Sequence, residues 1–148
     1  MSSALTVEII TPEKVTYTGQ ALSITLPTAA GQITVLPGHI PLVSPLVAGE
    51  VIIRDGKSEA YFAVSNGLAQ INASNIKILT SSAEQAEEID EARAEQARQR
   101  ALKLMTERRD DVDYAALSAK IEKELARLKV VRSRRRTHQN SPRPYAEE

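Results

Sequence analysis

The chain has 148 residues with no Cys, no Trp, one Phe and four Tyr, so any core must be modest and largely aliphatic. The lack of Cys excludes disulfides, thiolate metal sites and cysteine nucleophiles. Basic and acidic residues balance at 19 each, and no stretch approaches the roughly 18 apolar residues of a membrane span. We therefore expect any association with a membrane to be indirect.

The charges are spread unevenly along the chain. Residues 1–80 carry four Lys or Arg and five Asp or Glu, whereas residues 81–148 carry fifteen and fourteen. The hydrophobic period changes at the same point, from two residues to three or four. We predict a β domain at 1–81, a two-helix domain at 82–131, and a basic, disordered tail at 132–148.

Apolar and polar residues alternate up to about Thr80, as they do in half-buried strands. The alternating sets are Leu5, Val7 and Ile9; Leu22, Ile24 and Leu26; Ile33 and Val35; and Ile76 and Ile78. Turn signals separate them, and Asp55-Gly56 and Asn66-Gly67 are dipeptides favoured in tight type I′ hairpins. This pattern predicts an all-β sandwich or barrel of about eight to ten strands.

Helical signals begin at Ser82, which forms a capping-box pattern with Gln85, and no Pro or Gly follows until Pro142. A stripe of mostly small residues predicts the first helix: Ala83, Ala86, Ala94, Ala97, Ala101 and Leu104/Met105. Asp113 can cap a second helix whose apolar face is Tyr114, Leu117, Ile121, Leu125 and Leu128. The short link predicts an antiparallel hairpin, and the narrow stripes predict marginal docking.

Side chains suited to catalysis are scarce. The chain has two His, no Cys and no Ser in a G-x-S-x-G setting, so we expect no enzymatic activity. His39 lies in a Pro-Gly-His-Ile-Pro turn without a second ligand at metal-binding spacing, and we interpret it as structural or as a subunit contact. No Walker A or G-x-G-x-x-G loop is present, so a nucleotide would depend on cationic side chains.

The helical region separates its charges further. Residues 84–95 contain six acids and one base, whereas residues 98–136 contain thirteen bases and six acids. A solvated hairpin that pairs its acidic start with its own basic remainder explains this pattern. The alternative is that the basic residues face an acidic protein surface or the phosphates of a nucleotide. Charge alone does not separate the two.

Five segments in order resemble the epsilon subunits of F-type ATP synthases, which are called delta in mitochondria. They are VEIITPE at 7–13, VLPGHIPL at 35–42, FAVSNG at 62–67, AEQAEEID at 83–90 and DVDY at 111–114. The resemblance implies a non-catalytic rotor subunit whose β-sandwich sits on the gamma subunit and the c-subunit ring. It also implies a peripheral position on the cytoplasmic face of the bacterial inner membrane.

In that family the C-terminal helices inhibit ATP hydrolysis when they extend toward the alpha and beta catalytic subunits. The resemblance therefore implies beta contacts at Arg98, Lys103, Lys120, Lys123 and Lys129, and gamma or c-ring contacts at Gln32 and His39. Gln32 stands where many relatives carry an acid, which argues against a charge contact with the c ring at that residue.

The family's nucleotide motif, Ile/Leu-Asp-x-x-Arg-Ala, is matched by residues 89–94. By resemblance, the contacts of a regulatory ATP are Glu84, Ile89, Asp90, Arg93, Ala94, Arg100 and Arg127. The arginines can neutralise phosphates, although Lys123 stands where a further Arg would offer a planar fork. The alternative is that Asp90 and Arg93 form only an i,i+3 pair within a helix. No other cofactor is implied.

Two other classes of function compete with this one. A β-sandwich adaptor could bind nucleic acid through its basic C-terminal region, but only Tyr114 and Tyr145 supply aromatic rings there. A stand-alone enzyme lacks a nucleophile, a metal set and an acid–base pair. We therefore expect protein partners and no nucleic acid.

Overall fold

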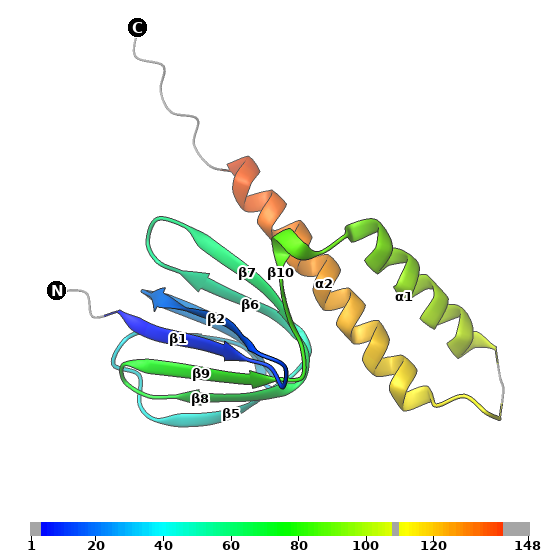
Figure 1. The fold of residues 1–148 in the computed structure, drawn as a ribbon, viewed down its shortest axis with the longest axis horizontal. Coiled ribbons are helices and arrows are strands. Elements are labelled where there is room, and N and C mark those ends of the chain that lie inside the picture. Colours follow the sequence, from blue (N-terminus) through cyan, green and yellow to red (C-terminus); the bar gives the residue numbers. More distant parts are fainter. Residues whose placement is uncertain (1–3, 108–109, 141–148) are drawn as a thin grey trace, which may run out of the picture.

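A β domain precedes a helical hairpin in the computed structural model, which describes residues 4–107 and 110–140 (Figure 1). The strands are β1 (Leu5–Ile10), β2 (Val15–Ala21), β3 (Ser23–Thr28), β4 (Gly31–Val35), β5 (Leu42–Leu46), β6 (Gly49–Arg54), β7 (Glu59–Val64), β8 (Gly67–Ile71), β9 (Asn75–Thr80) and β10 (Ala83–Gln85). They are followed by a 3-10 turn, η1 (Ala86–Glu88), and by α1 (Glu91–Thr106) and α2 (Tyr114–Asn140). The predicted fold class is confirmed.

The strands form a nearly closed sandwich. Their order is β10-β7-β6-β3-β5-β8-β9-β1-β2, and β4 pairs with β3 beside this path. The β1–β9 pair is parallel and the other pairs are antiparallel. The N-terminal strand therefore lies between β9 and β2, and its inward side chains close the sandwich.

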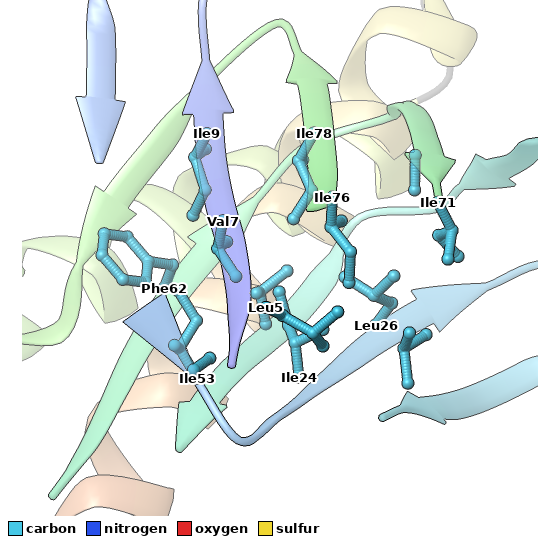
Figure 2. Close-up of a cluster of buried hydrophobic side chains, with 14 of the residues drawn as sticks. Leu5, Val7, Ile9, Ile24, Leu26, Ile53, Phe62, Ile71, Ile76 and Ile78 are labelled. Atoms are coloured by element: carbon cyan, nitrogen blue, oxygen red, sulfur yellow. The ribbon is translucent and has the colours of Figure 1, made fainter. Parts of the chain in front are cut away.

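The sandwich core is aliphatic and fully buried (Figure 2). Leu5, Val7 and Ile9 of β1 and Ile76 and Ile78 of β9 are all 0% exposed, as their alternation predicts. The single Phe, Phe62, packs edge-on against Tyr17 with ring centroids 5.2 Å apart. Complete burial contributes about 1.5–3 kcal/mol for each large aliphatic or aromatic side chain. Leu22, in contrast, is 38% exposed, so its predicted inward position is wrong.

The two predicted tight hairpins differ from the structure. Asp55-Gly56 lies in a four-residue loop between β6 and β7, where the Asp55 carboxylate accepts the N–H groups of Lys57 and Ser58 at 2.8 and 2.7 Å. Gly67 does not serve a hairpin, since β7 pairs with β6 and β10 whereas β8 pairs with β5 and β9. Glycine is required there because a Cβ would collide with the carbonyl oxygen of Leu79.

The helical domain starts later than the sequence indicates. The predicted helix start at Ser82 is wrong, because 83–85 form β10 along β7. The Ser82 hydroxyl lies 2.6 Å from the Ser65 hydroxyl and therefore bonds across the strands instead of capping a helix. The first helix begins only at Glu91, with Asp90 as its N-cap.

The hairpin stacks as two further layers on the sandwich. Helix α2 packs against β6 and β7, and α1 packs on α2 (Figure 1). Because α2 has a partner on two sides, its buried residues do not form the single stripe that we predicted. Leu128 is buried as expected, but Tyr114 and Leu125 are exposed, and Ala126 and Val130 are buried instead.

Helix α2 also extends beyond the predicted end of the helical domain. Residues 132–140 continue α2, so the prediction of a disordered tail at 132–148 is wrong for 132–140. No Pro or Gly lies between Gly67 and Pro142, so no helix-breaking residue interrupts α2. The remaining predicted tail, 141–148, lies outside the described residues.

Candidate functional site: the docked helical hairpin

A small apolar cluster joins the hairpin to the outer face of the sandwich. Tyr61 and Ala63 of β7 pack with Ala86 of η1, Ile89, and Val130 of α2. All five side chains are at most 8% exposed, but two of them are Ala. The apolar contribution to docking is therefore much smaller than the contribution of the core to the sandwich.

A partly buried ion-pair network lies beside this cluster. The Arg127 Nε donates to Glu84 Oε2 of β10 at 2.7 Å, and Arg127 Nη1 donates to Glu124 Oε2 at 2.8 Å. Glu124 is 6% exposed. Burial disfavours the charged guanidinium, but the hydrogen bonds and charges of Glu124 and Glu84 outweigh it, and the pKa of Arg127 is raised. These contacts tie α2 to the sheet.

The far end of α2 is held by more exposed contacts. Arg134 pairs with Glu87 at 2.9 Å, and Arg135 pairs with Glu91 at 2.7 Å. The hydroxyls of Thr137 and Tyr61 lie 2.6 Å apart, which joins the last turns of α2 directly to β7. Part of the basic segment thus pairs with the acidic start of the hairpin, as the solvated-hairpin interpretation expects.

The motif at 89–94 has a clear structural role in this form. Asp90 Oδ1 accepts the backbone N–H of Arg93 at 3.0 Å, so its carboxylate caps α1 rather than pairing with the Arg93 guanidinium. Ile89 and Ala94 are buried, Ile89 in the docking cluster. These three residues therefore position the start of α1, whatever else they bind.

The other four residues predicted to bind ATP fall into two groups. Glu84 and Arg127 contact each other across the β10–α2 boundary. Arg93 and Arg100 are exposed and lie seven residues apart, which places them on one face of α1. Within 4–107 and 110–140, the ion pairs and side-chain hydrogen bonds include neither of these two guanidinium groups. Both are therefore free to meet a ligand.

The basic residues predicted to contact the beta subunit are dispersed over the hairpin. Arg98 pairs with Glu95 at 2.9 Å, and Lys103 is exposed on α1. Lys120 and Lys123 line a hollow of about 320 Å³ between α2 and the β7–β8 link. Lys129 lines another of about 340 Å³, together with Gln32. Part of the surface of α2 therefore faces the sandwich rather than solvent.

The predicted gamma or c-ring contacts lie in β4, for Gln32, and on the connection from β4 to β5, for His39. Gln32 is exposed near the start of β4. His39 is half-buried, with Nδ1 2.6 Å from the carbonyl oxygen of Ile40, and follows Gly38, whose φ of +83° suits glycine. Sequence reasoning missed the apolar surface beside His39, where Ile40 is 75% exposed and Val43 58%. The consecutive apolar residues at 40–43, which break the two-residue period, were the available signal.

Membrane-spanning helices and metal-binding clusters are both absent from the described residues. In residues 4–107 and 110–140, no helix is long and apolar enough to cross a membrane. The same part of the chain holds no group of three or more His, Cys, Asp or Glu side chains that could bind a metal.

The fold and the site define a β-sandwich that carries a docked two-helix arm. A family model described as the beta-sandwich domain of the ATP synthase Delta/Epsilon chain matches residues 4–86. A second, described as the long alpha-helix domain of the same chain, matches residues 87–132. The chain belongs to the ATP synthase delta/epsilon family, and the predicted resemblance is confirmed.

Relatives along nearly the whole chain are ATP synthase epsilon chains, a non-catalytic subunit. The chain is 41% identical to that of Moorella thermoacetica, over 86% of this chain and 96% of the relative. It is 38% identical to that of Brevibacillus brevis, over 86% and 98%.

Solved structures share the fold. A chain of the Euglena gracilis mitochondrial ATP synthase matches with a TM-score of 0.75 at 21% identity, covering 87% of this chain and 81% of that one. A chain of the Tetrahymena thermophila mitochondrial enzyme matches with a TM-score of 0.53 at 16% identity, covering 88% and 95%.

Proposed function

We propose that this chain is a rotor subunit of the central stalk in a proton-translocating F-type ATP synthase, on the cytoplasmic face of a bacterial membrane. Its sandwich contacts the gamma subunit and the c ring, and its hairpin inhibits ATP hydrolysis when it leaves the sandwich for the alpha and beta subunits. The structures that share the fold support these partners, since they are mitochondrial ATP synthase assemblies that include F1 and a c ring, or a central stalk and a c ring.

The observation that carries the proposal is the weak and polar attachment of the hairpin. Its apolar cluster has five buried members, with Ile52 and Val131 packed against them, and its polar contacts include ion pairs and a hydroxyl pair. Ionised groups regain full hydration when α2 leaves, so release costs far less than opening the sandwich core. A hairpin held this way can move without unfolding its scaffold.

Release would also change what α2 presents. Arg127 is occupied by Glu84 and Glu124 in the docked form, and Lys123 and Lys129 face hollows against the sandwich. Once α2 is free, these cations can pair with acidic segments of a catalytic subunit. The exposed apolar residues Ile40 and Val43 support a separate, permanent contact of the sandwich with the stalk.

We also propose a regulatory ATP that favours the docked hairpin. Arg93 and Arg100 are exposed on one face of α1 and can bind phosphates, and Arg127 can join them if its bond to Glu84 rearranges. Ile89, Asp90 and Ala94 shape the start of α1 beside them. Such a ligand would act by differential affinity for the docked state.

A cross-link tests the inhibitory role. Because the chain has no Cys, Glu84→Cys with Arg127→Cys can be joined by a short bismaleimide, which holds α2 on β10. We expect the linked chain to assemble with the catalytic head and to inhibit ATP hydrolysis far less than the unlinked double variant, which lacks the same two side chains. The matched control is Glu8→Cys with Lys77→Cys, which links β1 to β9 within the sandwich. Equal inhibition by both linked chains would contradict the proposal.

A further inference from the structure

A third hollow lies where the β6–β7 loop meets the last turns of α2. Its volume is about 530 Å³, within the range of small-molecule sites. It is lined by cationic side chains from both domains: Arg54 and Lys57 of the sandwich, and Arg134 and His138 of α2. We name this the β6–α2 pocket. Arg134 is seven residues, or about 10 Å along the helix, beyond Arg127, so the pocket is separate from the nucleotide residues above.

The charges of the pocket are unbalanced. Two Arg and one Lys face a single lining acid, Glu59, and the imidazole of His138 adds another donor. Long helical side chains lean toward the N-terminus, so the cationic groups of α2 lie away from its last carbonyl groups. The lining therefore carries more cationic than anionic side chains, although Glu87 pairs with Arg134 and Asp55 acts electrostatically on Lys57 from outside the lining.

Contacts within the protein orient the cationic groups of the pocket but leave some of their N–H groups available for a ligand. Arg54 Nε donates to Glu59 at 2.7 Å and Nη1 donates to Thr25 at 3.0 Å, which fixes the guanidinium plane and leaves Nη2. Arg134 uses Nε toward Glu87. The Lys57 ammonium takes no part in the ion pairs of the described chain, although the Asp55 carboxylate fixes its backbone N–H.

We propose that the β6–α2 pocket binds a phosphate-bearing anion. Guanidinium forks and an ammonium group are the side chains that recognise phosphate oxygens. Because each domain supplies half of the donors, the anion bridges the sandwich and α2 and favours the docked hairpin. The donors of α2 lie at 134–138, beyond the residues 87–132 that match the helical family model. The site does not depend on the proposed inhibition of hydrolysis.

The test is calorimetric titration of the full chain with inorganic pyrophosphate at constant ionic strength. We expect saturable binding with one site, and a loss of about tenfold or more in affinity in Lys57→Ala with His138→Ala. Both side chains are exposed, so this variant should fold normally. Lys14→Ala with Lys77→Ala is the control, because it removes two exposed cations of the sandwich that do not line the pocket. Its affinity should stay within about twofold of the unchanged chain.

Two further measurements distinguish the outcomes. Sedimentation with phosphatidylglycerol vesicles shows whether a lipid headgroup supplies the phosphate, since the paired variant should then lose vesicle binding and the control should not. Hydrogen exchange of 130–138 should slow when pyrophosphate or vesicles bind. Equal losses in the pocket and control variants would show only general charge attraction, and no binding to either probe would overturn the site.

Discussion

The core of the sandwich and the attachment of the hairpin depend on different kinds of contact. The sandwich buries a continuous aliphatic core in which Ile24, Leu26 and Ile78 are 0% exposed. The hairpin buries alanines, Ala94 and Ala101 of α1, and depends on ion pairs for much of its attachment. Burial of large apolar groups gives a stable scaffold, whereas ion pairs exchange their partners at little cost. The comparison therefore separates a fixed domain from a releasable one.

The largest expected effect is in the sandwich core. Phe62→Ala should lower the free energy of unfolding by about 3–5 kcal/mol, because it removes a buried ring and leaves a cavity. Urea unfolding followed by circular dichroism measures this change. Val130→Ala, in the docking cluster, should mainly speed hydrogen exchange in α2. A loss of sandwich stability in Val130→Ala as large as in Phe62→Ala would contradict the separation of the two domains.

The next effect is in the buried ion pair. Arg127→Met should weaken docking by about 1–3 kcal/mol, because Glu124 stays buried without its main partner. Limited proteolysis or hydrogen exchange of α2 reports this change. Arg127→Met with Glu124→Leu should recover most of the loss, since an apolar pair leaves no uncompensated charge. No recovery in the double variant would mean that packing of Arg127, not its charge, holds α2.

The exposed ion pairs should contribute less. Arg134→Gln and Arg135→Gln should each weaken docking by about 0.2–1 kcal/mol, and 1 M salt should remove most of the difference. Hydrogen exchange of α2 at low and high salt measures both effects. Arg136→Gln is the matched control. Arg136 is exposed on the same turn of α2, but the ion pairs with Glu87 and Glu91 are made by Arg134 and Arg135. A salt-independent effect would assign the contribution to packing of the aliphatic stems.

The smallest effect should depend on pH and arises where the two domains meet. The hydrogen bond from Tyr61, opposed by burial and assisted by Arg54, holds the pKa of Glu59 below its ordinary 4.5. A lowered folded-state pKa stabilises the protein above the unfolded-state pKa, and that stabilisation disappears as pH falls through the folded-state value. Glu59→Gln should therefore be less stable than the unchanged chain at pH 7, and the gap should close below about pH 4.5 in thermal unfolding. A gap that does not narrow as pH falls below 4.5 would rule out this linkage.

Local sequence patterns were sufficient to predict burial where a residue's position depends only on its near neighbours in the chain. The alternation at Leu5, Val7 and Ile9 predicted an inward row in β1, since side chains two apart share one face of a strand. The stripe of small residues at Ala94 and Ala101 likewise predicted the buried side of α1. The family motifs added the class of protein, which no pattern of burial could supply.

Long-range contacts decided the rest. Ser82 caps no helix because Ser65, 17 residues away, takes its hydroxyl, and Arg127 pairs with Glu84 over 43 residues of chain. Spacing along the chain does not encode such partners.

By itself, the sequence determined an alternating β domain followed by a charged helical hairpin, because hydrophobic period and turn residues act over a few positions. Only the tertiary structure decided that α2 lies between the sheet and α1, which of its cations are paired, and that its last turns close the β6–α2 pocket. Those outcomes depend on surfaces that exist only once both domains have folded.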